Sequence, residues 1–244
     1  MPAERYFINA FFALEQTLLI EDQELHHLQT VMRTKIGDEI ELVNGQNQLA
    51  IAKVNKIDKK RAEIQIESVQ SKATKEHKLI LAQAIPRFNR LEFILEKGTE
   101  LGVDEFWLFP GIYSEKDLFS FNQHKRMEQL LISAMKQCGR WDLPFILEKP
   151  PLAQWTIPSA QIFFGDTKPS APLFMDVLNA SIQTSILLLI GPEKGFHPQE
   201  IAFLEHIQAQ GVKLNQNILR VDTAAISALS LLGQHVQKHI CIAL

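Results

Sequence analysis

Short apolar runs alternate with helical patterns over the last two thirds of the chain. The helical patterns place apolar residues three or four positions apart in residues 88–101 and 127–138. The apolar runs contain almost no polar alternation, which is typical of strands buried on both faces of a parallel sheet. They comprise residues 79–84, 106–110, 161–165 and 185–190. This order of strands and helices predicts an α/β domain with a mostly parallel sheet.

The N-terminal part of the chain follows a different pattern, with a period of two. Apolar and polar residues alternate in Glu39–Val43 and in residues 49–57 and 62–69, and Asn44-Gly45 is a strong hairpin turn. We expect a small, antiparallel, barrel-like unit here.

One helix is predicted within this unit. Glu21 and Asp22 open it, and its apolar face consists of Leu25, Leu28 and Val31. After the last strand, residues 68–78 are polar and charged, and we interpret them as a linker. The sequence therefore predicts two domains, residues 1–70 and residues 71–244.

Composition excludes several classes of protein. A chain of 244 residues with 46% hydrophobic residues can bury a sizeable core. It has no apolar run of membrane-spanning length and no N-terminal signal-peptide pattern. Cys138 and Cys241 are too few and too separated for a disulfide framework or a metal site, so we expect no metal and a reducing cytoplasm.

The formal net charge of −3 argues mildly against a nucleic-acid partner, because counterion release from phosphates needs clustered cations. Such clusters can still exist locally. A solvated hairpin explains the densest one at least as well, and its members are Lys53, Lys56, Lys59, Lys60 and Arg61.

The strongest candidate for chemistry lies near the C-terminus. The apolar run that ends at Ile190 leads into Gly191-Pro192, and Pro198 suits the first position of a helix. Ligands of open α/β sheets bind at such strand–loop–helix junctions. The stretch fits neither the dinucleotide-binding nor the P-loop pattern, and glycines alone are explained by a tight turn.

A second junction of this kind follows closely. Ile218-Leu219-Arg220 is a short piece that ends in a charge, and Asp222-Thr223 is the predicted N-cap of a long helix. The apolar face of that helix carries Ile226, Leu229, Leu232 and Val236.

These two stretches carry a resemblance. GPEKGF and ILRVDTA resemble the paired GPEGGF and LR-T-E-T-A motifs of the bacterial 16S rRNA uracil-N3 methyltransferases, the RsmE family of the SPOUT superfamily. The stretches HHLQTVMR, RLEFILEKGTELGV and AMKQCGRWDLP resemble further segments of the same family, so the resemblance covers nearly the whole chain. Lys194 stands where the family usually has glycine, and Val221 and Asp222 replace Thr and Glu.

The resemblance implies a fold, a cofactor and a partner. It implies a SPOUT domain with a trefoil knot at about residues 187–235, a PUA-like N-terminal domain that binds RNA, and a homodimer. S-adenosylmethionine would be held mainly by backbone groups, and the substrate would be 16S rRNA in the assembled small ribosomal subunit. The implied cofactor-binding residues are Leu189, Ile190, Gly191, Gly195, Asn217, Ile218, Leu219, Thr223 and Ala224.

Methyl transfer to N3 of uracil requires loss of the N3 proton and stabilisation of the resulting anion. Arg220 is the first candidate for the stabilising cation, with Asp222 or Glu193 as proton acceptor or as orienter of the arginine. Each of these three residues also has a possible structural role. Asp222 could cap its helix, Glu193 could shape its loop, and Arg220 could pair with Asp222 or with a partner subunit.

Three arginines are candidates for contact with RNA: Arg33, Arg87 and Arg140. For Arg33 an exposed position at a helix end is a comparable explanation, and for Arg140 an ion pair is. Two other functions are compatible with the sequence. One is methylation of another RNA nucleotide, and the other is RNA binding by a protein that has lost catalysis.

Overall fold

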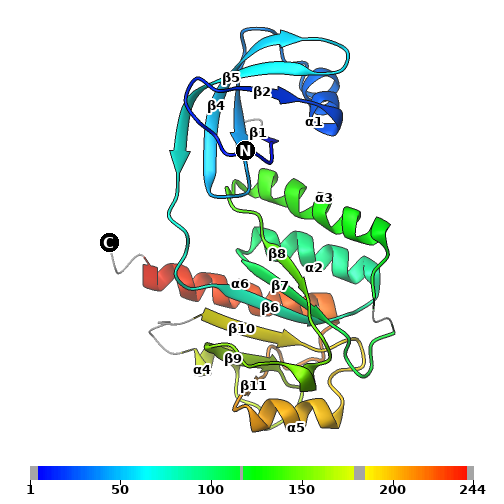
Figure 1. Ribbon diagram of the computed structural model, residues 1–244. Helices are drawn as coiled ribbons and strands as arrows, with labels where there is room; N and C mark the ends of the chain where they lie inside the picture. Colours follow the sequence, from blue (N-terminus) through cyan, green and yellow to red (C-terminus); the bar gives the residue numbers. More distant parts are fainter. Residues whose placement is uncertain (1–4, 116–117, 179–184, 241–244) are drawn as a thin grey trace. The chain divides into compact units, whose positions relative to one another are not determined.

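The computed structural model describes residues 5–115, 118–178 and 185–240, which form two compact units (Figure 1). The first unit contains the described residues up to 74 together with residues 132–143. The second unit contains residues 75–131 and the described residues from 144 onwards. The chain thus returns to the first unit at the end of one helix, α3 (Phe121–Cys138). The predicted domain boundary near residue 70 stays a prediction.

The first unit is built on a curled five-stranded sheet in the order β1-β3-β4-β5-β2. The strands are β1 (Arg5–Phe7), β2 (Thr17–Ile20), β3 (Glu39–Val43), β4 (Gln48–Ile57) and β5 (Ala62–Ser71). The pairs β3–β4, β4–β5 and β5–β2 are antiparallel, as predicted. The pair β1–β3 is parallel, so the sheet is not purely antiparallel. Its apolar face encloses a core that includes Tyr6, Phe12, Leu28, Leu42 and Ile64.

The predicted helix of this unit has an unexpected second half. A short α-helix, α1 (Asp22–His26), continues as a π-helix, η1 (His27–Val31). The wider turn changes which side chains face the core. Leu25 and Leu28 are buried, but Val31 is 59% exposed, so the predicted apolar face is wrong at Val31. The backbone N–H of Met32 donates to the carbonyl of His27, the five-residue spacing that characterises a π-helix.

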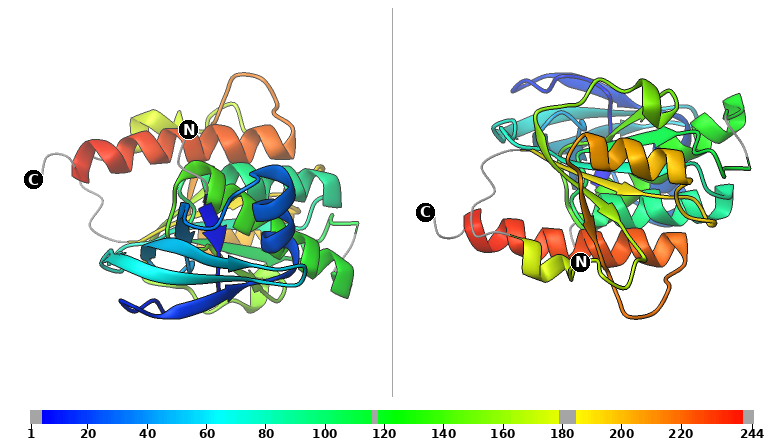
Figure 2. Two further views of the ribbon diagram at one scale, coloured as in Figure 1. Left: turned by 90° about the horizontal axis from the view of Figure 1, so that it is seen from above. Right: turned by 90° about the horizontal axis from the view of Figure 1, so that it is seen from below.

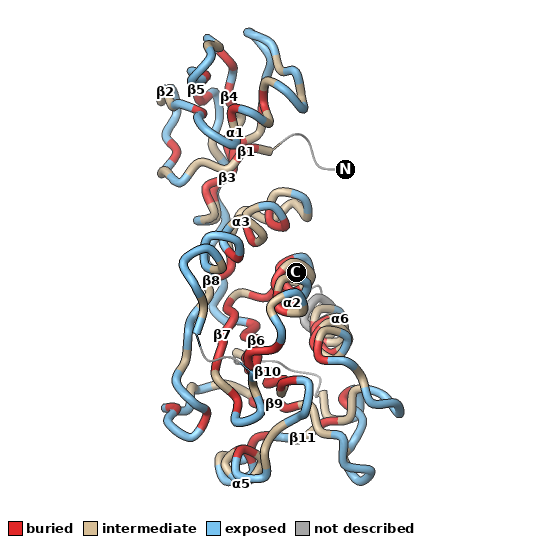
Figure 3. The backbone as a smooth tube through the Cα atoms, turned by 90° about the vertical axis from the view of Figure 1, so that its right-hand side faces the viewer, coloured by how far each residue is buried: buried red, intermediate tan, exposed pale blue. Residues whose placement is uncertain are grey.

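The second unit is built on a six-stranded sheet in which every neighbouring pair is parallel, in the order β11-β9-β10-β6-β7-β8. The strands are β6 (Leu79–Ala84), β7 (Glu105–Phe109), β8 (Phe145–Glu148), β9 (Ala160–Gly165), β10 (Ser185–Ile190) and β11 (Gln210–Val212). The central strands are buried along their length (Figure 3). The prediction of a parallel sheet with strands buried on both faces is therefore confirmed.

Helices cover both faces of this sheet, and the two layers can be followed in Figure 2. On one face, α2 (Phe88–Glu100) lies against α6 (Val221–Ile240), and Gly98 of α2 lies close to Phe106 of β7. On the other face, Leu204 of α5 (Pro198–His206) joins the core formed by alternate residues of the strands, among them Leu187 and Leu189. Two shorter helices are α4 (Phe174–Val177) and the 3-10 helix η2 (Leu152–Gln154).

Two predicted helix starts differ from the structure. Helix α3 begins at Phe121, six residues before the predicted start, and Ser120 closes its first turn by a hydrogen bond from the backbone N–H of Gln123. Helix α6 begins at Val221, so Asp222-Thr223 is not its N-cap. Val221, the first residue of the helix, is buried. Among the described residues, no helix has the length and apolar character needed to cross a membrane.

Candidate functional site

The two motif loops meet at one edge of the parallel sheet. Strands β9 and β10 end at Gly165 and Ile190, and the carboxyl ends of parallel strands share an edge. The loops after these strands and the segment between β11 and α6 surround a cavity of about 520 Å³. The lining comes from residues 165–167 and 169, residues 190–196, residues 213–219, and Val221 and Ala224.

Most of the predicted cofactor-binding residues line this cavity. They are Ile190, Gly191, Gly195, Asn217, Ile218, Leu219 and Ala224. Two others lie elsewhere. Leu189 is buried in the core beneath α5, because it faces the opposite side of β10 from Ile190. Thr223 is exposed in the first turn of α6.

A second cavity, of about 590 Å³, lies at the opposite edge of the sheet, beside Ala160 and Gln210 at the amino ends of β9 and β11. None of the predicted site residues lines it. In addition, no group of three or more His, Cys, Asp or Glu side chains within the described ranges could hold a metal ion. The cavity at the carboxyl edge is therefore the candidate site.

The glycines of the first loop are required by its tight shape. A Cβ atom on Gly191 would lie 3.1 Å from the backbone of Gly195 and Phe196, because the loop folds back on itself there. Gly195 has a φ of +76°, in the left-handed region that favours glycine. Nothing lies within 4 Å of the position of a Cβ on Gly195, so this glycine leaves open space beside the cavity.

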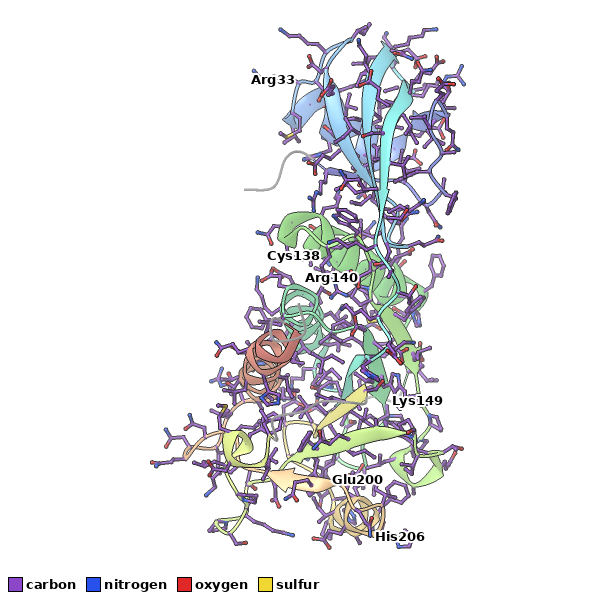
Figure 4. The ribbon with its side chains drawn as sticks, turned by 90° about the vertical axis from the view of Figure 1, so that its left-hand side faces the viewer. Arg33, Cys138, Arg140, Lys149, Glu200 and His206 are labelled. Atoms are coloured by element: carbon purple, nitrogen blue, oxygen red, sulfur yellow. The ribbon has the colours of Figure 1, made fainter. Side chains whose placement is uncertain are left out.

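Two carboxylates fix the same loop to its surroundings. Glu193 Oε1 accepts a hydrogen bond of 3.0 Å from the backbone N–H of Arg87, just before α2. Glu200 is buried at the start of α5 (Figure 4) and accepts from the backbone N–H groups of His197, at 2.8 Å, and Ile112, at 3.1 Å. Glu193 was a predicted catalytic residue, whereas Glu200 was not among the predicted site residues.

The predicted catalytic residues of the second motif have different surroundings. Asp222 Oδ2 lies 2.5 Å from Nη1 of Arg90, which links α6 to α2, and Asp222 Oδ1 accepts from the backbone N–H of Thr223. Burial alone would raise the pKa of Asp222, but the hydrogen bond from Arg90 and the one from Thr223 hold this pKa below its ordinary value. The carboxylate is therefore ionised at neutral pH. Arg90 was not among the sequence candidates.

Arg220 is exposed and has no hydrogen bond or ion pair with any side chain that the structure describes. Its carbonyl accepts the first intrahelical hydrogen bond of α6, from the N–H of Ala224. The predicted alternative pair between Arg220 and Asp222 is not present, and Asp222 forms its ion pair with Arg90 instead. The cation at position 220 thus stands beside the N-terminus of α6, where the helix dipole also favours an anion.

The three candidate RNA-binding arginines differ in their exposure. Arg33 is exposed and follows the π-helix with a φ of +56°, which is unusual for a residue with a side chain. Arg87 is exposed, and its guanidinium lies 3.2 Å from Glu115, whose hydrogen bond raises the pKa of the guanidinium. Arg140, labelled in Figure 4, has a side chain only 12% exposed. It pairs with Asp142, so the alternative role in an ion pair is present.

Two domain families match the chain. The family described as an RNA methyltransferase domain matches residues 73–233, and the one described as an RNA methyltransferase PUA domain matches residues 20–67. Among proteins of known name, the ribosomal RNA small subunit methyltransferase E of Rickettsia conorii is 27% identical over 98% of this chain and 99% of its own. The protein of the same name from Buchnera aphidicola is 29% identical over 93% of this chain and 94% of its own.

Solved structures share the fold over nearly the whole length. A ribosomal RNA small subunit methyltransferase E from Neisseria gonorrhoeae, crystallised with S-adenosylmethionine, has a TM-score of 0.83 at 26% identity, covering 96% of this chain and 98% of that one. A methyltransferase from Legionella pneumophila, also in complex with S-adenosylmethionine, has a TM-score of 0.85 at 25% identity with the same coverage.

Proposed function

Because this chain belongs to the RNA methyltransferase family that its motifs indicated, we propose that it methylates N3 of a specific uridine in 16S rRNA, with S-adenosylmethionine as the methyl donor. The proposal follows the relatives, which are named for methylation of small-subunit ribosomal RNA, and two structural neighbours that were crystallised with this cofactor.

One observation carries the proposal to this chain. The loops that contain GPEKGF and ILRVDTA are separated in sequence by a helix and a strand, yet both line the same cavity of about 520 Å³. This volume is within the range of small-molecule sites, and the position at the carboxyl edge of a parallel sheet is where such sites occur.

The residues around the cavity fit S-adenosylmethionine. Apolar side chains such as Ile190 and Leu219 suit a flat aromatic base, and the glycine loop offers backbone groups without side-chain obstruction. Asp166 and Glu193 place carboxylates in the lining, which suits the positive charge and the amino group of the ligand. When bound, this cofactor supplies an electrophilic methyl group.

The chain's own groups prepare the nucleophile. Arg220 is the proposed cation that stabilises the uracil anion, because it is exposed at the N-terminus of α6 and engages no described side chain. Asp222 is proposed to position Arg90, since both of its carboxylate oxygens accept hydrogen bonds, one from Arg90 and one from the N–H of Thr223. Glu193, exposed and with one engaged oxygen, is then the candidate acceptor of the N3 proton.

The proposed partner is the assembled small ribosomal subunit. We assign RNA binding to the PUA-like N-terminal unit and propose contacts from Arg33 and Arg87, while Arg140 would have to exchange its pair with Asp142 for a phosphate. A knot at residues 187–235, a homodimer and a cytoplasmic location complete the proposal. They follow from the family resemblance and from the substrate.

The test is methyl transfer to small ribosomal subunits from cells that lack this activity, followed by mass spectrometry of the nucleosides. We expect one 3-methyluridine per 16S rRNA, and none added to subunits that already carry the modification. A different methylated nucleoside would favour another RNA target. Cofactor binding and methyl transfer both absent would favour a catalytically silent RNA-binding protein.

A further inference from the structure

Gln83 is a fully buried polar residue among apolar neighbours in the central strand β6. Its side-chain nitrogen donates to the carbonyl of Ala84 at 2.8 Å and lies 3.3 Å from the carbonyl oxygens of both Ile190 and Gly191. Three carbonyl oxygens around one atom identify that atom as the amide nitrogen, because an oxygen there would face three like partners.

The amide oxygen of Gln83 has no hydrogen-bond donor among the described residues. Gln83 Oε1 is buried and accepts no hydrogen bond from any group that the structure describes. An apolar side chain would fill the same position without leaving a buried carbonyl unpaired. The distinctive contribution of Gln83 is therefore its hold on the end of β10, where the glycine loop begins.

The Gln83 amide binds the backbone where the loop begins, at the last residue of β10 that pairs with β6. Strand β10 lies between β6 and β9, and none of the described peptide bonds is cis. A trans peptide points its C=O and N–H groups in opposite directions. Because the Ile190 carbonyl is directed to Gln83 on the β6 side, the N–H of Gly191 is directed to the β9 side, where Gly165 and Asp166 line the cavity.

We infer that Gln83 is a positioning residue for the cofactor pocket. By binding the Ile190 and Gly191 carbonyls, it keeps the N–H of Gly191 turned into the cavity as a donor to an acceptor atom of bound S-adenosylmethionine. The inference rests on the proposed function for the identity of this ligand. It needs only binding of the ligand, and it does not depend on which nucleotide is methylated.

The test measures S-adenosylmethionine affinity by calorimetry between pH 6 and pH 9 for the wild type and two variants. Gln83→Met keeps the length of the side chain and removes the donor, so we expect affinity to fall about tenfold or more at every pH. Gln83→Glu places a carboxyl against three carbonyls, where burial raises its pKa. We expect weak binding at pH 9 and recovery towards wild-type affinity at pH 6, where the protonated carboxyl donates again.

Gln48→Met is the matched control. Gln48 is also a buried glutamine with hydrogen-bonded amide atoms, but it lies in the first unit beside Asn44 and Phe12. We expect it to lower the melting temperature without changing the affinity. The recovery of Gln83→Glu at low pH distinguishes positioning from general loss of structure, and it can be measured even if Gln83→Met does not fold.

Wild-type affinity in Gln83→Met, or affinity in Gln83→Glu that follows the wild-type pH profile, would overturn the inference. Failure of the proposed function looks different: the wild type would bind S-adenosylmethionine with the same dependence on Gln83 but would form no 3-methyluridine.

Discussion

Asp222 illustrates how a side chain's partners limit its chemical role. Its carboxylate binds Arg90 and the N–H of Thr223, and these contacts lower its pKa against the opposing effect of burial. A carboxylate stabilised in its ionised form is a weaker base than a free one. The sequence offered Asp222 as proton acceptor, helix cap or orienter of an arginine. We propose that Asp222 orients an arginine, and that this arginine is Arg90 and not Arg220.

We expect Asp222→Asn to lower the free energy of unfolding at pH 7 by about 1–2 kcal/mol, because Arg90 loses its charged partner in a partly buried site. A lowered pKa in the folded state stabilises the protein above the ordinary value of 3.8, and this contribution disappears as the pH falls through the folded value. Urea unfolding at pH 7 and pH 3 should therefore show a difference between wild type and variant that shrinks at pH 3. A constant difference would show that the ion pair is not its source.

Arg220→Ala should separate catalysis from cofactor binding. The side chain is exposed, so the fold should be unaffected, while loss of the proposed cation should lower kcat about 10²-fold or more. Cofactor affinity should stay near that of the wild type, measured by calorimetry beside the methyl-transfer assay. Arg126→Ala is the control, because Arg126 is also exposed but pairs with Glu92 outside the cavity. Unchanged kcat in Arg220→Ala would remove Arg220 from the mechanism.

At the scale of elements, the loop between β10 and α5 has a backbone conformation at Gly195 in which a residue other than glycine would be strained. Gly195 and Gly102 form a matched pair, with φ of +76° and +90° and no atom within 4 Å of an added Cβ. Only Gly195 lines the cavity. Substitution of either by Ala should cost about 1 kcal/mol of stability through backbone strain. We expect only Gly195→Ala to weaken S-adenosylmethionine binding as well. Equal affinities in the two variants would show that the loop's conformation at Gly195 does not contribute to binding of the ligand.

Elements with a strong local pattern could be predicted from the sequence. The strands β6, β7, β9 and β10 are mostly apolar runs, and the starts of α2 and α5 lie where their patterns placed them. Their burial and parallel pairing follow from that composition. The candidate site could be predicted from the sequence for the same reason, because both of its loops adjoin such elements and carry the family motifs.

Other features depend on contacts that no local pattern encodes. The π-helical turn that exposes Val31, the start of α6 at the buried Val221, and the parallel pairing of β1 with β3 are set by tertiary packing. The roles of Gln83 and Arg90 could not be predicted from the sequence, because each residue hydrogen-bonds to a partner more than 100 positions away. A single polar residue in a strand or on a helix gives no sign of such a distant partner.

At the scale of the whole molecule, the chain's path makes the first unit a composite of two segments. Residues 132–143 belong with the N-terminal residues, and Met135, Trp141 and Leu143 share a small core with Val43 and Leu49. Lys136 Nζ lies 2.5 Å from Glu24, and Lys72 lies over the ring of Trp141. Strand β5 extends to Ser71, so the linker predicted at residues 68–78 is wrong over residues 68–71 and comprises residues 72–78. It is not the only connection of the N-terminal segment to the rest of the chain.

Cleavage of that linker should leave the two fragments associated. With a site-specific protease sequence inserted after Thr74, in the exposed linker, we expect the cut protein to elute from a sizing column as one species. Trp141→Ala should weaken this association by up to about 3 kcal/mol, or roughly 100-fold, because the indole packs between the segments of the first unit. Trp155→Ala removes an indole from the core of the second unit and should leave the N-terminal fragment bound. Release of that fragment from the otherwise unaltered protein would mean that the packing at Trp141 contributes too little to hold the first unit together without the linker.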